Sequence, residues 1–382
     1  MQNLHKYFSL SRFGSKNLYS ESNNTPFLCL FSSVSSLVQN QPSSFSNFLI
    51  ETLAFSEPQA ISISNLFPPT KTLQKPHSVV QFLRQLGFSN TQVRSSIRIK
   101  PHMLFSDIDM TLKPKLQFFQ ELGLTGPDLC KFISTHPVFL FYSLERTLIP
   151  CVDIIKKTLV NDKNNQDLIF VLQRSHRFSN QSISRLKCNI AFLESCGIVG
   201  SQLSMLLKRR PSLMFSREQS LKNIVLRVSD MGFLIGSRML VHAVDMVSCT
   251  SVETFNWKIE LFRTFGFSAD ECMEMFRRAP NLLAISEGKL KLGMEFFLNE
   301  VKFERSKLVR RPICLLFSME ERIIPRYKVL QVVKCKKLLK KEPSLATALG
   351  FSEEKFVEKF ISRFRDDAEE LLVAYKGKTL DS

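Results

Sequence analysis

The segment Phe265–Ser286, FGFSADECMEMFRRAPNLLAIS, is the clearest copy of a repeat, because other parts of the chain carry imperfect versions of it. Gly266 is followed fourteen residues later by Pro280. Apolar residues stand six, nine and ten positions after the glycine, at Cys272, Met275 and Phe276. An i, i+3, i+4 spacing places side chains on one face of a helix. The stretch therefore predicts an amphipathic helix that starts after Gly266 and stops before Pro280.

The same glycine-to-proline frame recurs elsewhere, at Gly87 and Pro101, Gly123 and Pro137, and Gly197 and Pro211. A short apolar turn and a second helical pattern follow each frame, so one unit is a helix, a proline stop, a turn and a helix. The period is about 34 to 37 residues, and we expect about seven units. The third and fifth units lack the proline. Such a repeat predicts an all-α helical-repeat solenoid.

Two segments of different composition flank the repeats, which we expect to span residues 76–348. Residues 349–382 begin with Leu349-Gly350-Phe351-Ser352 and continue as one helix with no proline frame and several acidic residues. A polar terminal unit is what an open stack of repeats needs as a cap. We therefore expect a capping helix with an acidic tail at this end, and a monomer overall.

Residues 1–75 have the composition of an organellar transit peptide followed by an unfolded segment. The first fifty residues contain twelve serines, the basic residues Lys6, Arg12 and Lys16, and one acidic residue, Glu21. Basic, serine-rich and acid-poor leaders direct proteins to organelles. A basic amphipathic pattern over residues 4–18 favours the mitochondrion, which we expect as the location, and the excess of serine makes the chloroplast the alternative. An untargeted disordered tail is the alternative.

Charge points to a polyanionic partner. The chain of 382 residues carries a formal charge of +17 and has a sequence pI of about 9.5. The net charge is +2 over residues 1–75, +17 over 76–348 and −2 over 349–382, so the excess lies on the repeats. A strongly basic face is typical of nucleic-acid binding, and the alternative is a basic surface that serves solubility alone.

Motifs for catalysis, cofactors and metals are missing from the sequence. The nine cysteines form no CxxC pair, and the six histidines form no HxxxH pair. Gly377-Lys378-Thr379 lacks the upstream glycine of a phosphate loop, and no dinucleotide fingerprint or nucleophile elbow occurs. No apolar run reaches the length of about 18 residues that spans a bilayer. We expect no enzyme activity, no cofactor, no metal site and no membrane partner.

The last two units resemble one family. The segment Phe265–Ser286 is followed by RRPICLLFSMEERIIPR at residues 310–326. Both resemble the mitochondrial transcription termination factor (mTERF) family, specifically its plant branch, and the resemblance covers about residues 77–352. The residues that carry it are Gly266, Phe267, Ser268, Arg277, Arg278, Pro280, Leu283, Ser286, Arg311, Pro312, Leu316, Phe317, Ser318, Glu321, Arg322, Pro325 and Arg326.

The resemblance implies a right-handed superhelix shaped like half a doughnut, with a concave basic groove that holds nucleic acid. Members of the family act in organelles on transcription initiation, termination or transcript maturation, including splicing, and are not enzymes. The implied ligand is double-stranded DNA or structured RNA, between which the resemblance does not choose. Organellar transcription or splicing factors are the implied protein partners.

Basic residues cluster where each first helix of a unit ends. We call them the helix-end cations: Arg98, Lys100, Lys208, Arg209, Arg210, Arg277, Arg278, Arg310 and Arg311. Stacked units present equivalent positions along a curved surface that can follow a phosphate backbone. The alternative explanation is that cations favour the negative end of a helix dipole. Recurrence in four units favours the interpretation that they bind phosphate.

A second set of candidates lies on the second helices and the turns before them: Lys113, Lys115, Arg146, Lys222, Lys258, Lys289, Lys291, Arg322, Arg326 and Lys328. Arg146 and Arg322 follow Glu145 and Glu321, so structural ion pairs are the alternative for them. Two functions remain open, an organellar nucleic-acid binder that regulates gene expression and a helical-repeat scaffold that binds proteins. A continuous basic inner surface would favour the first, and mixed charge or an exposed apolar groove the second.

Overall fold

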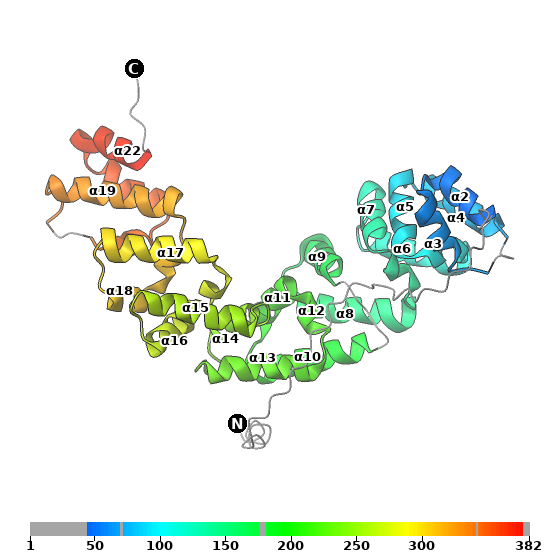
Figure 1. Cartoon of the computed structure of the whole chain (residues 1–382), viewed down its shortest axis with the longest axis horizontal. Coiled ribbons are helices and arrows are strands. Elements are labelled where there is room, and N and C mark those ends of the chain that lie inside the picture. Colours follow the sequence, from blue (N-terminus) through cyan, green and yellow to red (C-terminus); the bar gives the residue numbers. More distant parts are fainter. Residues whose placement is uncertain (1–43, 69–71, 176–180, 341–342, 377–382) are drawn as a thin grey trace, which may run out of the picture.

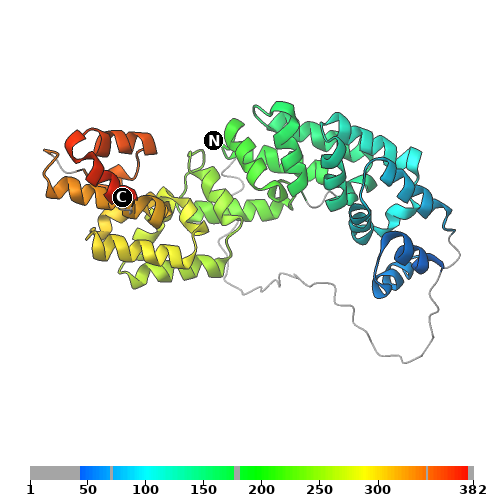
Figure 2. The same cartoon turned by 90° about the horizontal axis from the view of Figure 1, so that it is seen from above.

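The computed structural model describes residues 44–68, 72–175, 181–340 and 343–376, and all regular structure within them is helical. The prediction of an all-α helical-repeat fold is confirmed. The units stack into an open arc, with α2–α7 in one limb, α10 and α13 along the middle, and α17, α19 and α22 in the other limb (Figure 1). Seen from above, the units follow one another along the longest axis (Figure 2). The buried apolar side chains form one core cluster that includes residues from Phe45 to Leu371.

Seven units alternate a first helix and a second helix. The first helices are α5 (Asn90–Ile99), α7 (Gly126–Thr135), α9 (Gln166–Arg174), α11 (Gly200–Arg209), α14 (Leu240–Val247), α16 (Ala269–Arg278) and α18 (Arg305–Arg310). The second helices are α6 (Lys113–Glu121), α8 (Ile149–Thr158), α10 (Ser182–Ser195), α13 (Glu218–Asp230), α15 (Val252–Thr264), α17 (Glu287–Glu295) and α19 (Ile324–Cys335). A short helix, α12 (Pro211–Met214), forms the turn of the fourth unit.

The helix α16 shows why the glycine-to-proline frame folds as predicted. Gly266 has a φ of +84°, which a glycine adopts without strain, and this ends α15. The Ser268 side chain accepts a hydrogen bond from the backbone of Glu271, whose side chain bonds back to Ser268, so a capping box starts α16. The helix ends before Pro280, and a 3₁₀ turn, Pro280–Ala284, follows. The predicted stripe Cys272, Met275 and Phe276 is fully buried.

Three second helices begin with a wide turn that the sequence pattern did not predict. In these units a capping residue, Asp107, Ser143 or Ser318, stands seven positions before a proline. The amide of Leu112 donates to the carbonyl of Asp107 five residues earlier, at 3.1 Å, and equivalent bonds occur in the other two units. Proline has no amide hydrogen and crowds the preceding turn of a helix. The π-type turn accommodates Pro114, Pro150 and Pro325 at the first turn of the α-helix that follows.

A repeated hydrogen bond joins each of four second helices to the next unit. Side chains from α6, α10, α15 and α19 each donate to a backbone carbonyl 25 residues further along: Lys115 to Leu140 (2.5 Å), Asn189 to Met214 (2.9 Å), Lys258 to Leu283 (2.7 Å) and Arg326 to Phe351 (2.8 Å). We call this contact the carbonyl clamp. In the first three pairs the carbonyl lies in the turn after the next first helix.

Burial makes the carbonyl clamp structural. All four donor side chains belong to buried residues. Desolvation lowers the pKa of Lys115 and of Lys258 from the usual lysine value. A buried carbonyl that loses its donor costs about 1–3 kcal/mol, so each clamp fixes the spacing of two units. Lys115 and Lys258 were expected as candidates for phosphate contact. That expectation is wrong, because both side chains are buried and donate to backbone carbonyls of the next unit. Lys289 also bonds a carbonyl of the next turn, that of Leu316, at 2.8 Å.

The fold begins earlier than expected. The helices α2 (Ser44–Leu53) and α3 (Glu57–Ser64) lie within the segment 1–75 that we expected to be unfolded. The α2 helix buries Phe45, Phe48, Leu49 and Leu53 in the core, ahead of α4 (Gln74–Gln85). The expected boundary at residue 75 is therefore wrong for residues 44–68. The transit-peptide prediction for residues 1–43 lies outside the described residues.

The C-terminal end is also larger than one helix. After α20 (Leu345–Ala348), the chain forms α21 (Glu353–Val357), a π-type turn over Glu358–Ser362 and α22 (Ala368–Lys376). The α22 helix packs on α19 and buries Leu371. The expectation of a single capping helix over 349–382 is corrected to two helices that cover the end of the stack.

Candidate nucleic-acid interface

Most of the helix-end cations contact other residues of the protein. Residues directly before the proline contact the next unit. The ammonium of Lys100 lies 5.4 Å from the ring centre of Phe141, and Arg311 Nη1 donates to Thr347 Oγ1 at 3.2 Å. Arg210 Nε donates to Asp245 Oδ1 of α14 at 2.7 Å. These contacts connect the end of each first helix to the following unit.

Asp245 is a buried carboxylate held by two guanidinium groups. It is 1% exposed, and Arg209 Nη1 lies 3.0 Å from its Oδ2 while Arg210 holds Oδ1. A buried charge is tolerated only when it is paired in this way. Two guanidinium groups and one carboxylate leave a net charge of +1 in this cluster, and the Arg209 side chain is 49% exposed. Sequence reasoning missed Asp245, although an acidic residue inside the apolar run of α14 was a usable signal.

Lys208 and Arg277, each three positions before a proline, contact the preceding units. Lys208 Nζ lies 2.9 Å from Asp167 Oδ2 at the start of α9. Arg277 Nη1 donates to the carbonyl of Met231, after α13, at 3.2 Å. Both side chains are about one-third exposed. The recurrence of cations at the ends of the first helices therefore has a structural component that the helix dipole alone does not explain.

Arg277 and Arg278 share one carboxylate on their own helix. Glu274 Oε2 accepts from Arg277 Nη2 at 2.9 Å, and its Oε1 accepts from Arg278 Nε at 2.6 Å. These hydrogen bonds lower the pKa of Glu274 from the usual glutamate value. Arg278 also donates to the carbonyl of Arg310 at 3.2 Å, which connects α16 to α18. The group keeps one net positive charge on a surface where Arg278 is 47% exposed.

Three predicted arginines reach the surface with no partner. The side chains of Arg98, Arg146 and Arg310 are exposed and make no hydrogen bond or ion pair in the part of the chain that the structure describes. Glu145, beside Arg146, forms no ion pair with it there. Because no internal contact has to be broken, these guanidinium groups are the most available of the predicted set for an anionic ligand.

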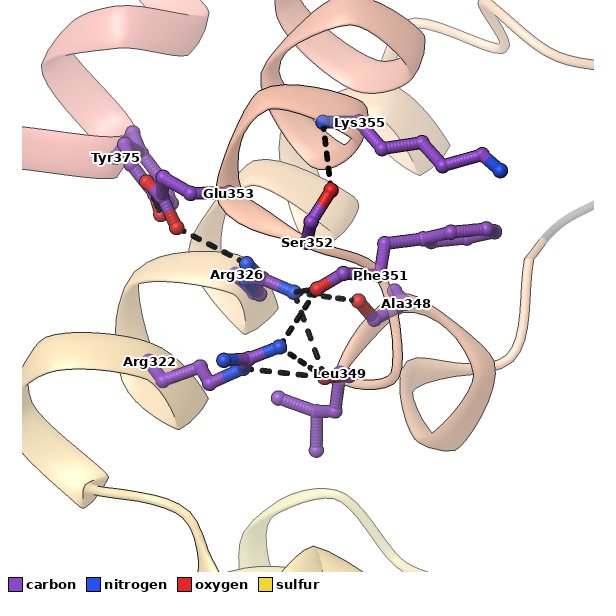
Figure 3. A network of polar contacts seen from close by, with 9 residues as sticks. All are labelled: Arg322, Arg326, Ala348, Leu349, Phe351, Ser352, Glu353, Lys355 and Tyr375. Atoms are coloured by element: carbon purple, nitrogen blue, oxygen red, sulfur yellow. Dashed lines mark hydrogen bonds and ion pairs between the residues drawn. The ribbon is translucent and has the colours of Figure 1, made fainter. Parts of the chain in front are cut away.

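Arg322 and Arg326 serve the C-terminal cap instead (Figure 3). Arg326 is fully buried, donates to the carbonyls of Ala348 and Phe351, each at 2.8 Å, and pairs with Glu353 at 3.0 Å. The prediction that Arg326 contacts nucleic acid is therefore wrong. Arg322 donates to the carbonyls of Leu349 and Phe351, and desolvation together with Arg326 lowers its pKa. We remove Arg326 from the candidate interface and treat Arg322 as structural.

The Glu353 carboxylate completes this network. It accepts a hydrogen bond from the Tyr375 hydroxyl of α22 as well as from Arg326. Both bonds lower the pKa of Glu353, the tyrosine contributing more, and burial together with this contact raises the pKa of Tyr375. The network thereby joins α19, α21 and α22 into one terminal unit.

Sites of other kinds do not emerge from the described ranges. They contain no cluster of three histidine, cysteine or acidic side chains that could hold a metal ion. Burial raises the pKa of the thiols of Cys151, Cys272 and Cys314 to about 11, so these thiols are poor nucleophiles. None of the described helices combines the length and apolarity needed to cross a bilayer.

Known proteins supply an independent comparison. The family model described as mTERF matches residues 80–234 and 237–357 of this chain. Transcription termination factor MTERF4, chloroplastic, of Arabidopsis thaliana is 33% identical over 103 residues, which are 26% of this chain and 18% of that protein. Transcription termination factor MTERF8, chloroplastic, of the same plant is 23% identical over 143 residues, which are 37% of this chain and 29% of that protein.

These similarities are partial in length, because the matches span less than a third of either relative. The family match, in contrast, covers most of this chain and runs through all seven units. It agrees with the helical repeat, the proline-ended first helices and the resemblance seen in the sequence. The chain belongs to the mTERF family.

Proposed function

We propose that this protein binds nucleic acid in an organelle and regulates gene expression there without catalysing a reaction. The observation that carries this proposal is the recurrence of helix-end cations along the stack, combined with the +17 charge of residues 76–348. Arg98 and Arg310 are exposed without a partner among the described residues, and the clusters around Asp245 and Glu274 each keep one net positive charge.

The mode of binding follows from the arrangement of these cations. Arginine forms paired hydrogen bonds with phosphate oxygens, and successive phosphates can be followed by successive units. Such contacts position a protein on a nucleic acid without reading its sequence. The proposed ligand is double-stranded DNA or structured RNA held along the inner curve of the arc. Both relatives are named as chloroplastic transcription termination factors. Their names favour a role in transcription for this protein, and they favour the plastid over the mitochondrion as its location.

The affinity of the full chain for three ligands of matched organellar sequence tests this proposal. Duplex DNA, single-stranded DNA and structured RNA would be compared at one low salt concentration. Preference for duplex DNA supports a role in transcription, and preference for RNA supports transcript maturation. Weak binding to all three would contradict the proposal.

A protein-binding scaffold is the second candidate. Val199, Leu234 and Ile235 are exposed apolar residues, with exposed fractions of 53%, 76% and 38%. They belong to neighbouring loops, because the Gly236 amide donates to the carbonyl of Cys196 at 3.1 Å. Exposed apolar residues gathered in this way favour protein contacts. Weak binding to every nucleic acid would make this surface the first place to seek a partner.

Replacing Glu274 by Gln should strengthen nucleic-acid binding. The carboxylate neutralises one of two arginines, so its loss raises the local net charge from +1 to +2. One additional phosphate contact is worth about eightfold in affinity at 0.1 M salt on duplex DNA. Titration of the variant with labelled duplex measures the gain.

Glu260→Gln is the matched control, since Glu260 pairs with Arg263 on the exposed surface of α15. A gain in Glu274→Gln that exceeds the gain in this control would place Arg277 and Arg278 at the interface. Equal affinities in both variants and the wild type would remove this pair from it.

A further inference from the structure

A surface hollow of about 350 Å³ lies at the N-terminal end of the stack, where α5 meets the corner between α2 and α3. One wall is the face of α5 that carries Thr91, Arg94, Ser95 and Arg98. These positions are spaced i, i+3, i+4 and i+7, so their side chains share one face of the helix. The other wall is the α2–α3 corner together with Gln59 of α3.

The α2–α3 corner is held in place by two arginines. Arg84 Nη2 of α4 donates to the carbonyl of Thr52 at 3.0 Å. Arg94 Nη1 donates to the carbonyl of Ala54 at 2.9 Å, which fixes its guanidinium at the edge of the hollow. Arg94 uses only one of its nitrogens in this bond, so the others remain able to donate. The hollow is therefore a site of fixed shape that needs both α5 and the N-terminal helices.

The chemistry of the lining residues selects an anion. None of the residues that line the hollow is acidic. The guanidinium groups of Arg94 and Arg98, the Ser95 hydroxyl and the Gln59 amide all supply hydrogen-bond donors. Two arginines one helical turn apart, with a hydroxyl and an amide beside them, match the oxygens of a tetrahedral phosphate.

We propose that this hollow binds one phosphate group of a nucleic-acid strand and anchors the strand at the N-terminal end of the arc. The inference rests on the proposed function and extends it to residues that the family match does not include, because α2, α3 and Gln59 precede residue 80. It also gives the exposed Arg98 a defined ligand. A free phosphate or a nucleotide carries the same group, so the experiment must separate these sources.

Two variants test the two walls of the hollow. Arg98→Gln replaces the charged guanidinium on α5 with a neutral amide, and Gln59→Glu places a carboxylate on α3 at nearly the same size. Each should weaken the binding of the full chain to duplex DNA or structured RNA by about eightfold at 0.1 M salt and reduce the salt slope by about one. Arg363→Gln is the matched control, since Arg363 is exposed in the C-terminal cap and loses the same charge.

Inorganic phosphate supplies the second arm. At constant ionic strength it should raise the melting temperature of the wild type more than that of either variant. Loss of both nucleic-acid affinity and phosphate protection in both variants supports the inference. Unchanged nucleic-acid affinity in both would overturn it, whether or not free phosphate protects the wild type. Failure of the wild type to bind any nucleic acid would instead overturn the proposed function.

Discussion

Replacing Arg326 by Ala should destabilise the C-terminal cap by about 3 kcal/mol. The side chain is fully buried and donates to the carbonyls of Ala348 and Phe351. Its guanidinium also lies 4.5 Å from the ring centre of Phe356. Each buried acceptor that loses its donor costs about 1–3 kcal/mol, and the ring contact is lost as well. Because repeat proteins are stabilised mainly between neighbouring units, the cap should open before the rest of the stack.

Hydrogen exchange of α21 and α22, together with urea denaturation, measures this effect. The expected result is fast exchange in these two helices and near-normal protection in α5–α11. Lys355→Gln is the control, because Lys355 is exposed in the same segment and only its backbone amide takes part in the network of Figure 3. A change in stability below about 0.5 kcal/mol for Arg326→Ala would show that the carbonyl clamp is not a determinant of stacking.

Neutralising Arg98, Arg146 and Arg310 together should reduce nucleic-acid affinity by several hundred-fold at 0.1 M salt. The three side chains are exposed and have no partner within the described residues, so no internal contact is broken. Each phosphate contact contributes about eightfold at this salt on duplex DNA, and three contacts multiply to that total. The triple glutamine variant would be titrated with labelled duplex DNA and structured RNA, with circular dichroism to verify its helix content.

The control for this triple variant is neutralisation of three exposed cations of the C-terminal cap, Lys355, Lys359 and Arg363. This control variant loses the same three positive charges, but from the C-terminal cap instead of the repeats. An equal loss of affinity in both variants would mean that general charge, rather than the first-helix ends and the turn at Arg146, attracts the ligand.

The repeat could be read from the sequence because its signals are local. The glycine that ends one helix, the serine that caps the next and the proline that stops it act within a few residues, as Gly266, Ser268 and Pro280 show. The spacing of apolar residues then fixed the buried face. The same signal was available for α2, where Phe45, Phe48, Leu49 and Leu53 form a helical stripe, but the serine-rich composition of the first fifty residues concealed it.

The interface was less predictable because the partners of a cation are set by contacts between units. Lys258 and Arg98 are both basic residues on amphipathic helices. The structure buries the first against the carbonyls of Leu282 and Leu283 and exposes the second. Nothing local distinguishes them, since the acceptors lie 24 and 25 residues away from Lys258. Three of the four clamp donors, Lys115, Asn189 and Lys258, stand 22 positions before a proline, and a search for that spacing would have found them.

The salt dependence of wild-type binding shows whether successive units contact successive phosphates. If the cations of successive units follow a phosphate backbone, about 5 to 8 contacts give a slope of log affinity against log salt of roughly −4 to −7 on duplex DNA. The measurement is a titration of the full chain with duplex DNA and structured RNA between 50 and 300 mM salt, roughly the range in which counterion release governs affinity. A slope in that range on either ligand is the predicted result. A slope near zero on both, or no binding at the lowest salt, would show that these cations do not follow a phosphate backbone.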